Sequence, residues 1–346
     1  MPRSGGPDVT IVSLGSTAGL RLADEALAAS LRRAGASVVI VAVERPSQVR
    51  TLMLTDLVWA RAARRASVRA KPAGATVYSS VTAALLWPVR GAIRFDAPSA
   101  GNRPGRHGLW QRPLERLRLR QAPLLLPWSE GGLREAPGGA AAQAAGRTLV
   151  LPVPVEPSGP LDGSRDVAAL TYAANPRKKG LDRVLAAWRE VRDVLPDGAE
   201  LHVAGASVES LAQAGFGDLE REPGIRVVGA LAVAEYRALL RRARVFVCAP
   251  RREDYGIAQL EALADGCQLV TNEAPGPYAA LPLARRLDQR LVGDDLVGAL
   301  RAALLEPLPG YAEEARGAIE PFRADTVDRL VAQELLPRLL ARDQRR

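Results

Sequence analysis

Two glutamates in one short segment are the residues of this sequence whose types and spacing best suit chemistry. Glu253 and Glu261 lie eight positions apart in Glu253-Asp-Tyr-Gly-Ile-Ala-Gln-Leu-Glu261. Glu253 can hold sugar hydroxyls from a loop, and Glu261, about two helical turns further, can accept two hydrogen bonds from a ribose diol. Gly256 permits a tight turn into a helix whose first amides form an anion site suited to a diphosphate, at Tyr255, Gly256 and Ile257. Spacing alone is equally consistent with a capping glutamate and a solvated glutamate on a helix face.

A pair of lysines forms the second candidate feature. The chain has 3 lysines and 44 arginines, and two of those lysines are adjacent, Lys178 and Lys179. A compact ammonium in a chain that otherwise uses guanidinium groups indicates a site that needs a point charge. The pair lies in Asn175-Pro-Arg-Lys-Lys-Gly180, directly before a helical segment. The alternative is chance placement on a surface turn.

The elements that must position these residues follow an alternating pattern of strands and helices. An apolar strand at 9–14, a glycine loop, a helix at 20–34 and a strand at 37–43 form a parallel α/β unit, and further strands are expected at 76–79, 92–95, 124–127 and 148–153. Residues 136–146 suggest a surface helix end or loop. Four prolines between 152 and 160 mark a linker.

The pattern then restarts after the linker. Strands are expected at 167–173, 200–204, 225–228, 245–249 and 268–271, with helices between them and a last helix at 325–341 interrupted by Pro337. The fold class is therefore α/β, with two Rossmann-like doubly wound domains and a ligand site in the cleft between them. We expect an N-terminal domain over 1–152, a second domain over 153–320, and a C-terminal helix over 321–346 that packs back on the first domain.

Composition excludes several classes of protein. Hydrophobic residues are 47% and charged residues 25%, which is typical of a globular protein, and no apolar run is long enough to cross a membrane. Two cysteines and two histidines argue against a disulfide scaffold and against a multi-histidine metal site. Residues 1–8 lack the apolar core of a secretion signal. We expect a cytoplasmic protein that needs neither metal nor cofactor.

Positive charge is concentrated in the first part of the chain. The formal net charge is +9, yet residues 57–120 alone hold 13 basic and 2 acidic side chains. Such a block can attract a phosphorylated acceptor or an anionic membrane surface. The sequence contains no nucleic-acid-binding motif, so we do not expect nucleic acid as a partner. A solvated arginine-rich face is the plain alternative.

Taken together, these motifs resemble the retaining glycosyltransferases of the two-domain GT-B class, family 4 type (glycosyl transferases group 1). The match rests on Glu253, Tyr255, Gly256, Glu261, Ala262 and Gly266, on Asn175–Asp182, and, more weakly, on the Gly15–Gly19 loop and Ser129. It covers about residues 9–340.

The resemblance implies transfer of a sugar from a nucleotide-diphosphate donor, with retention and without a metal. The second domain would bind the donor, through Arg177, Lys179, Tyr255, Gly256, Ile257, Glu261 and Gly205, with Gly15 contributing from the first. Glu253, Lys179 and Asp96 would be catalytic. The first domain would hold an unidentified acceptor, anionic or lipid-linked, near Ser16, Arg21, Arg103 and His107.

Two departures from the family pattern carry consequences. Ala173 and Ala174 stand where family members have Gly-Arg, so Arg177 is the candidate substitute. Asp96 stands where many members have a histidine near the transferred sugar. Three alternatives follow: Asp96 takes over its role, His107 reaches in from the next loop, or neither residue acts.

Two other functions remain open at this point. A GT-B nucleotide-sugar epimerase would share the fold and convert the sugar without an acceptor. A non-catalytic GT-B paralogue would act as a binding subunit.

Overall fold

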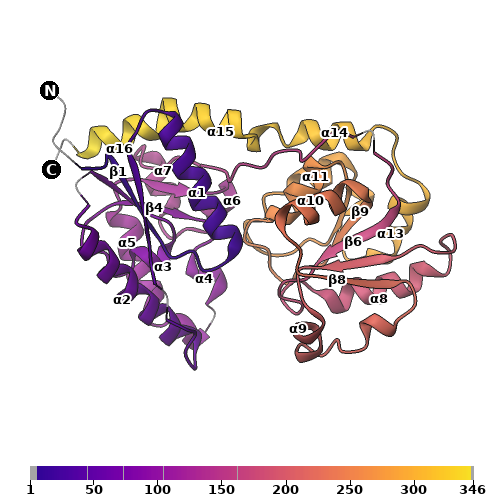
Figure 1. Ribbon diagram of the computed structural model, residues 1–346. Helices are drawn as coiled ribbons and strands as arrows, with labels where there is room; N and C mark the ends of the chain where they lie inside the picture. Colours follow the sequence, from indigo (N-terminus) through magenta and orange to yellow (C-terminus); the bar gives the residue numbers. More distant parts are fainter. Residues whose placement is uncertain (1–5, 45, 73, 104, 162, 344–346) are drawn as a thin grey trace. The chain divides into compact units, whose positions relative to one another are not determined.

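The chain forms two compact units, each built around its own parallel sheet (Figure 1). The computed structural model describes residues 6–44, 46–72, 74–103, 105–161 and 163–343. The first unit comprises Met1–Pro154 and Pro321–Arg346, and the second comprises Val155–Glu320. Residues 1–5, part of the segment in which no secretion signal is expected, lie outside the described residues.

The first unit has a five-stranded sheet in the order β2-β1-β3-β4-β5, with every pairing parallel. Its strands are short and apolar, and β1 is buried along its whole length. The order reverses direction between β1 and β3, so the loops after these two strands diverge at a topological switch point. The strands are β1 (Val9–Ser13), β2 (Val38–Ala42), β3 (Ala75–Tyr78), β4 (Ala92–Phe95) and β5 (Leu125–Pro127).

Side-chain caps begin several helices of this unit. Thr17, Thr51, Ser80 and Ser129 each accept a hydrogen bond from the backbone amide three residues later. Apolar residues at helical spacing then bury one face of each long helix against the sheet. The helices are α1 (Ala18–Arg33), α2 (Leu52–Ala70), α3 (Val81–Ala84), α4 (Ser99–Asn102), α5 (Gln111–Gln121), α6 (Glu130–Glu135) and α7 (Gly139–Ala144), with a 3₁₀ turn, η1 (Gly105–Gly108).

The C-terminal segment packs on the first unit. Its helices are α15 (Ala324–Leu330) and α16 (Leu336–Asp343), joined by a π-helical turn, η5 (Val331–Leu335). Val327, Val331 and Leu335 belong to the same apolar core as β1 and α1, and Arg33 pairs with Asp328 at 2.7 Å. The helix continues through Pro337. The π turn just before it accommodates the proline, which lacks an amide and crowds the carbonyl four residues earlier.

Two expectations for the first unit need correction. Residues 148–153 form no strand: Thr148 makes a single bridge to Leu125, because Pro127 of β5 accepts a hydrogen bond from Leu151 but has no amide to donate back. Residues 136–146 contain the helix α7, whose Ala142 is buried in the core.

The second unit has a five-stranded parallel sheet in the order β10-β9-β6-β7-β8. Its switch point lies between β6 and β9, so the loops leaving these two neighbouring strands diverge at their carboxyl ends. The strands are β6 (Val167–Tyr172), β7 (Leu201–Ala204), β8 (Ile225–Gly229), β9 (Ala243–Cys248) and β10 (Gln268–Thr271).

Helices cover both faces of this second sheet (Figure 1). They are α8 (Leu181–Arg192), α9 (Val208–Gln213), α10 (Val233–Arg242), α11 (Ile257–Ala264), α12 (Leu281–Leu287), α13 (Leu296–Leu305) and α14 (Tyr311–Ala318), with 3₁₀ turns at η2 (Leu219–Arg221) and η3 (Gln289–Leu291). A further 3₁₀ turn, η4 (Glu320–Phe322), lies where the chain passes from the second unit to the first. Among the described residues of either unit, no helix is long and apolar enough to span a membrane.

Candidate active site

Two loops of the second unit meet at the switch point of its sheet. One leads from β6 to α8 and carries Lys178 and Lys179, and the other leads from β9 to α11 and carries Glu253. The backbones touch at Gly180, where an added Cβ would lie 1.9 Å from the carbonyl oxygen of Ala249. Gly180 also has φ +66°, which favours glycine. The close approach therefore sets the position of the lysines relative to Glu253.

Lys179 and Glu253 form an ion pair across these loops. The ammonium nitrogen lies 2.6 Å from Oε2 of Glu253, and the side chains are 22% and 6% exposed. Gln259, from α11, donates to the same carboxylate oxygen at 3.0 Å. Oε1 of Glu253 receives no hydrogen bond from the described residues. The site therefore holds a buried carboxylate whose Oε2 is paired with Lys179 and Gln259 and whose Oε1 is available to a ligand.

Helix α11 starts beside this pair. Gly256 caps it with φ +93°, and a Cβ there would lie 2.8 Å from the ring of Tyr278. Tyr255 is buried, and its carbonyl accepts a hydrogen bond from Ala279. The first turn, which begins at Ile257, thus starts next to Glu253 and Lys179. The positive end of its backbone dipole favours an anion at this point.

Lys178 has a separate partner. Its ammonium contacts Oδ2 of Asp254 at 2.9 Å, and the Arg252 guanidinium contacts Oδ1 at 2.9 Å. Burial acts to raise the pKa of Asp254, but the two cations outweigh it and hold that pKa below its usual value. Asp254 therefore stays ionised, and it would keep one cation if Lys178 were removed.

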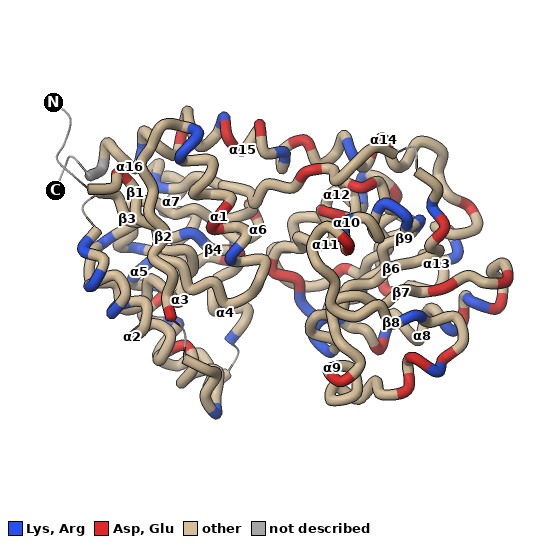
Figure 2. Tube along the Cα trace, viewed as in Figure 1, with Lys and Arg blue, Asp and Glu red and all other residues tan. Residues whose placement is uncertain are grey.

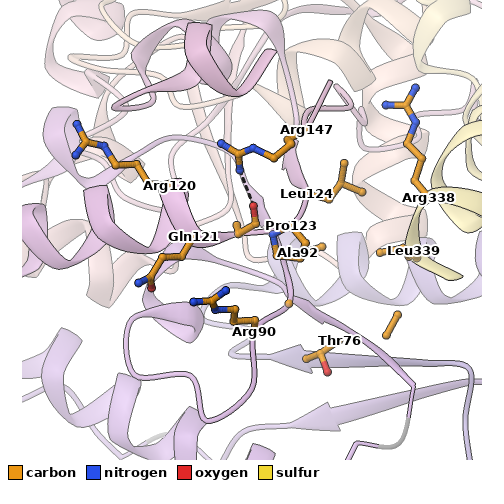
Figure 3. Close-up of a pocket in the computed structure, with 13 residues that line it drawn as sticks. Thr76, Arg90, Ala92, Arg120, Gln121, Pro123, Leu124, Arg147, Arg338 and Leu339 are labelled. Carbon is orange, nitrogen blue, oxygen red and sulfur yellow. Dashed lines mark hydrogen bonds between the residues drawn. The ribbon is translucent and has the colours of Figure 1, made fainter. Parts of the chain in front are cut away.

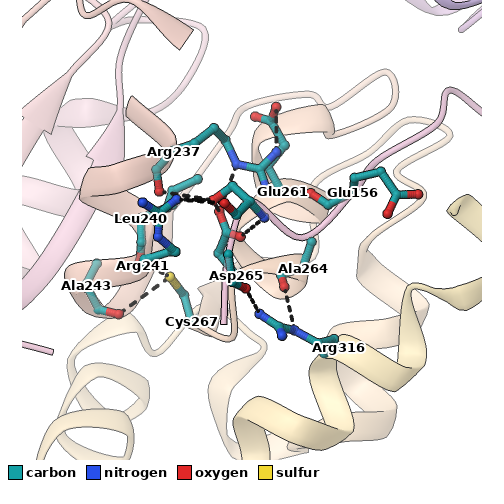
Figure 4. A network of polar contacts seen from close by, with 12 residues as sticks. Glu156, Arg237, Leu240, Arg241, Ala243, Glu261, Ala264, Asp265, Cys267 and Arg316 are labelled. Carbon is teal, nitrogen blue, oxygen red and sulfur yellow. Dashed lines mark hydrogen bonds and ion pairs between the residues drawn. The ribbon is translucent and has the colours of Figure 1, made fainter. Parts of the chain in front are cut away.

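Glu261 lies further along α11 in a network of polar contacts (Figure 4). Arg237, from α10, contacts it at 3.5 Å and contacts the fully buried Asp265 more closely, at 2.8 Å. Ser158 donates to Asp265 through its backbone amide and its hydroxyl. Burial raises the pKa of Glu261 and Asp265 adds to the rise, while Arg237 opposes it. Within the described part of the chain, Arg237 is thus the one cation that contacts Glu261, and Asp265 shares it.

Aromatic rings lie close to Glu261. Tyr172, at the end of β6, packs against Tyr236 of α10 with ring centroids 5.2 Å apart. Burial raises the pKa of each tyrosine, and the charge of Glu261 contributes to both rises. Gly205, which follows β7 with φ +90°, leaves room for the Tyr172 ring, since a Cβ there would lie 2.7 Å from it. Gly205 thus packs against the same tyrosine whose pKa the charge of Glu261 helps to raise.

Arg177 is not brought to the Lys179–Glu253 pair by any contact among the described residues. Its Nε donates to the carbonyl oxygen of Ala214, beyond the end of α9, at 3.3 Å. The guanidinium therefore lies along the outside of the loop, as an exposed side chain.

Gly15, Ser16 and Arg21 occupy one loop of the first unit. Gly15 follows β1 with φ +51°, and a Cβ there would lie 2.6 Å from the Arg21 side chain. Arg21 returns a hydrogen bond to the Gly15 carbonyl at 3.2 Å. The three residues are therefore held together at the carboxyl edge of the first sheet.

A buried ion pair lies beneath this loop. Asp24 and Arg94 are each 1% exposed and 3.4 Å apart, and Ser13 donates to Asp24 at 2.5 Å. The Arg94 guanidinium also stacks on the ring of Trp128. Burial raises the pKa of Asp24, and Arg94 opposes the rise. Asp96 comes just past β4, and because β1, β3 and β4 are parallel it lies at the same edge of the sheet as Gly15.

Asp96, His107 and Arg103 occupy different environments. Asp96 accepts a hydrogen bond from the Ala97 amide at 2.7 Å, while His107 is an exposed residue of η1. Arg103 is engaged with the buried Asp56 of α2 through two hydrogen bonds of 2.7 and 3.2 Å. Asp96 belongs to the first unit, whereas Glu253 and Lys179 belong to the second.

Sequence reasoning missed three residues that complete the candidate site. Gln259 lies between the two glutamates and could have been noticed as a polar position on the buried face of α11. Tyr172 ends a strand at the switch point, which is a recognisable signal. Arg237 lies in an arginine-rich helix, where nothing distinguishes it from its neighbours.

Part of the chain matches a described protein family. Residues 167–307 match the family described as glycosyl transferases group 1. That range spans both loops of the candidate site, including Lys179, Glu253 and Glu261. A sequence search of curated proteins gave no significant match.

Solved structures share the fold of the whole chain. Sucrose-phosphate synthase from Thermosynechococcus elongatus superposes with a TM-score of 0.72 at 15% identity, covering 98% of this chain and 100% of that one. WaaG, a glycosyltransferase involved in lipopolysaccharide biosynthesis, gives 0.67 at 16% identity, with coverage of 96% and 99%. The pneumococcal O-GlcNAc transferase GtfA, solved with UDP and GlcNAc, gives 0.57 at 13% identity over 77% of this chain. This chain spans 57% of GtfA.

These similarities confirm the expected fold class, two parallel-sheet Rossmann-like domains, and the structural neighbours are GT-B glycosyltransferases. Together with the group 1 domain they support a transferase, and more specifically a glycosyltransferase of the GT-B type.

Proposed function

We propose that the protein transfers a sugar from a nucleoside-diphosphate donor, with retention of anomeric configuration and without a metal. The observation that carries the proposal is the Lys179–Glu253 ion pair beside the first turn of α11, at the switch point of the second sheet. Lys179 and the helix amides would offset the charge that develops on the leaving diphosphate. GtfA, which shares the fold, was solved with UDP and GlcNAc, and this supports a donor of that class.

The two glutamates have different roles in this proposal. Glu253 offers its second carboxylate oxygen to hydroxyls of the transferred sugar. Glu261, beside the Tyr172 and Tyr236 rings, accepts the ribose hydroxyls of the nucleoside. The bond from the anomeric carbon to the diphosphate breaks, a bond to the acceptor oxygen forms, and the acceptor proton leaves with the diphosphate. In the first unit, Asp96 is the catalytic candidate, and Ser16 and Arg21 are acceptor-side candidates.

The proposal is tested by incubating the protein with nucleotide sugars, with and without candidate acceptors. A thermal-shift panel of UDP, GDP, ADP and dTDP first identifies the base, since a ligand at 100 times its dissociation constant adds about 2.7 kcal/mol of stability. Transfer to an acceptor supports a glycosyltransferase. Conversion of the sugar without an acceptor would identify an epimerase instead. Donor binding with neither reaction nor hydrolysis would indicate a binding subunit.

We also propose that the acceptor is anionic or lipid-linked, and that α2 faces an anionic membrane surface. Arg61, Arg65 and Arg69 are exposed and, with Val68, line one open groove of about 690 Å³ (Figure 2 shows the basic positions along α2). Each basic residue near an anionic surface contributes about 1 kcal/mol, so three together contribute about 3 kcal/mol. WaaG, involved in lipopolysaccharide biosynthesis, shares the fold.

The membrane proposal is tested by co-sedimentation with anionic and neutral vesicles. Replacing Arg61, Arg65 and Arg69 by glutamine should weaken binding to anionic vesicles by about two orders of magnitude, and added salt should have a similar effect. Arg64 is left unchanged because it donates to the Leu86 carbonyl. A matched control neutralises three exposed arginines of the second unit, Arg183, Arg286 and Arg301. Equal loss in both variants, or no binding by the wild type, would reject the proposal.

A further inference from the structure

A buried glutamine lies between the two glutamates of the candidate site. Gln259, on α11, is 1% exposed, and its Nε2 donates to Oε2 of Glu253 at 3.0 Å and to Sγ of Cys248 at 3.5 Å. A side-chain amide has two N–H groups on one atom and none on the other, so only its nitrogen can donate to a carboxylate. The orientation of the Gln259 amide is therefore fixed, with both of its hydrogens in use.

The amide oxygen of Gln259 is left out of this arrangement. Oε1 is buried and has no hydrogen-bond partner among the described residues. The stability lost through this unpaired oxygen and the stability gained through the bond to a charged carboxylate are similar in size and opposite in sign. An apolar side chain of similar length, such as methionine, would fill the same space without an unpaired oxygen. The glutamine therefore adds little to the stability of the fold, and its contact with Glu253 has another purpose.

A chain of buried hydrogen bonds continues from Gln259 into the sheet. Sγ of Cys248, at the end of β9, donates to Oγ1 of Thr271 at 3.3 Å, and the Tyr278 hydroxyl lies 3.0 Å from the same oxygen. Thr271, which ends β10, donates in turn to the carbonyl oxygen of Asn272 at 3.4 Å. Because a hydroxyl donates once and accepts twice, Tyr278 donates to Thr271. Burial raises the pKa of Cys248, so the thiol keeps the proton that this chain requires.

This chain limits the movement of the Glu253 carboxylate. Turning the Gln259 amide would break its contacts with both Cys248 and Glu253, so two strands of the sheet hold it in place. The last torsion of a glutamate side chain is soft, and a single contact from the long side chain of Lys179 would leave the carboxylate free to turn. With Lys179 and Gln259 both on Oε2, the plane of the carboxylate and the direction of Oε1 are set.

We propose that Gln259 is a positioning residue, which holds the Glu253 carboxylate with Oε1 directed at the hydroxyls of the transferred sugar. The inference rests on the proposed glycosyl transfer and adds a residue that acts only through Glu253. Gln259 is too buried to touch a substrate itself. Its loss should therefore slow the reaction of bound donor, because small errors in the position of a reacting group lower the rate, while binding of the nucleoside diphosphate is kept.

The test compares Gln259→Met with a matched control, Gln268→Met. Gln268 is a second buried glutamine of the same unit: it is 7% exposed, its amide donates to the Ala303 carbonyl at 2.7 Å, and its Oε1 also has no partner among the described residues. It begins β10, at the edge of the parallel sheet opposite to the loop that carries Glu253. The two substitutions thus make the same chemical change inside and outside the candidate site.

Three measurements are made on the full-length protein. Turnover is the release of nucleoside diphosphate from UDP-, GDP-, ADP- and dTDP-glucose, with water as the acceptor. Calorimetry gives the affinity for the four diphosphates, and thermal unfolding gives Tm. We expect Gln259→Met to lower kcat by about tenfold or more, with diphosphate affinity within about twofold and Tm within about 2 °C of the wild type. Gln268→Met should leave kcat within about twofold of the wild type.

A double-variant cycle tests whether Gln259 acts through Glu253. In the Glu253→Gln background, Gln259→Met should change kcat by less than about twofold, because the carboxylate that it orients is already absent. If Gln259→Met fails to fold, Cys248→Ala is the second variant, since it removes one anchor of the same amide. It should lower kcat by about threefold with unchanged diphosphate affinity, and no loss there would overturn the inference.

An unchanged kcat in folded Gln259→Met, or the same fractional loss with and without the Glu253 carboxylate, would also overturn the inference and leave glycosyl transfer in place. A loss of diphosphate affinity equal to the loss in kcat would do the same, because it would assign Gln259 to the binding of the nucleotide. A wild type that releases no diphosphate from any of the four donors would instead overturn the proposed function, and the inference with it.

Discussion

Replacing Lys179 by methionine should weaken binding of the nucleoside diphosphate and slow transfer. The ammonium is 22% exposed and lies 2.6 Å from Glu253, so the site already excludes much of the water that would screen its charge. A hydrogen bond to a charged group contributes about 1.5–3 kcal/mol, which corresponds to a 10- to 150-fold loss of diphosphate affinity. By analogy with a lost oxyanion donor, kcat should fall by roughly 10² to 10³.

Replacing Glu253 by glutamine should act in the opposite direction on the same binding step. The carboxylate competes with the diphosphate for the Lys179 protons and repels the incoming anion. Affinity for the nucleoside diphosphate should therefore be unchanged or several-fold tighter, while transfer falls because the sugar hydroxyls lose their acceptor. Isothermal titration with the nucleoside diphosphate, paired with a transfer assay, measures both effects.

Lys178→Met is the matched control, because it removes the same charge one residue away. Its partner Asp254 keeps the Arg252 guanidinium, so we expect diphosphate affinity within about threefold of wild type. Removing Lys179 also leaves Glu253 without its cation, which should lower stability by about 2 kcal/mol. If Lys179→Met and Glu253→Gln lost diphosphate affinity by the same factor, the pair would be only structural and the reasoning would fail.

The remaining predictions concern Glu261, Gly180 and metal dependence. Glu261→Gln should weaken nucleoside binding and increase the stability of the fold. The pKa of Glu261 is raised above 4.5 in the folded protein, so ionising this carboxyl costs folding free energy as the pH rises above 4.5. Glutamine cannot ionise and avoids this cost. Thermal unfolding should show the Glu261→Gln variant to be more stable than the wild type at pH 7 but not at pH 4. Gly180→Ala should destabilise the second unit by several kcal/mol in denaturant titration, because its Cβ meets the Ala249 carbonyl at 1.9 Å. Transfer should be unaffected by chelators such as EDTA, and a loss restored by added divalent cation would contradict metal independence.

The fold could be predicted from the sequence because local signals agree with burial. Apolar runs such as 9–13 and 268–271 become fully buried strands, and Thr17 or Ser129 mark helix starts by capping them. The segment at 148–153 misled for a physical reason: its apolar residues suit a strand, but Pro127 of the neighbouring strand β5 has no amide to donate, so the pairing stops after one bridge. Its backbone still follows β5, with Leu149 and Leu151 donating to it.

The candidate site could be predicted only in part. Lys179 and Glu253 carry signals in their own segments, and the alternation of strands and helices suggests that their loops share one edge of the sheet. Nothing in either segment shows that the two side chains form an ion pair, because that follows from the contact between Gly180 and Ala249, 69 residues apart in the printed sequence. Arg237 and Asp265 are likewise paired by packing between α10 and α11.

The arginines between residues 57 and 120 show why counting charges along a sequence can mislead. The excess of basic residues between 57 and 120 suggests one positively charged surface, and the fold divides it. Arg61, Arg65 and Arg69 lie on an exposed helix face, Arg103 neutralises the buried Asp56, and Arg94 is buried with Asp24. Arg90 and Arg120 instead join Arg147 and Arg338, from outside that block, around one cavity (Figure 3). If all these arginines formed one solvated face, none would pair with a buried carboxylate or line a cavity. The arginines of this block therefore occupy at least three different environments: an exposed helix face, buried ion pairs and a cavity wall.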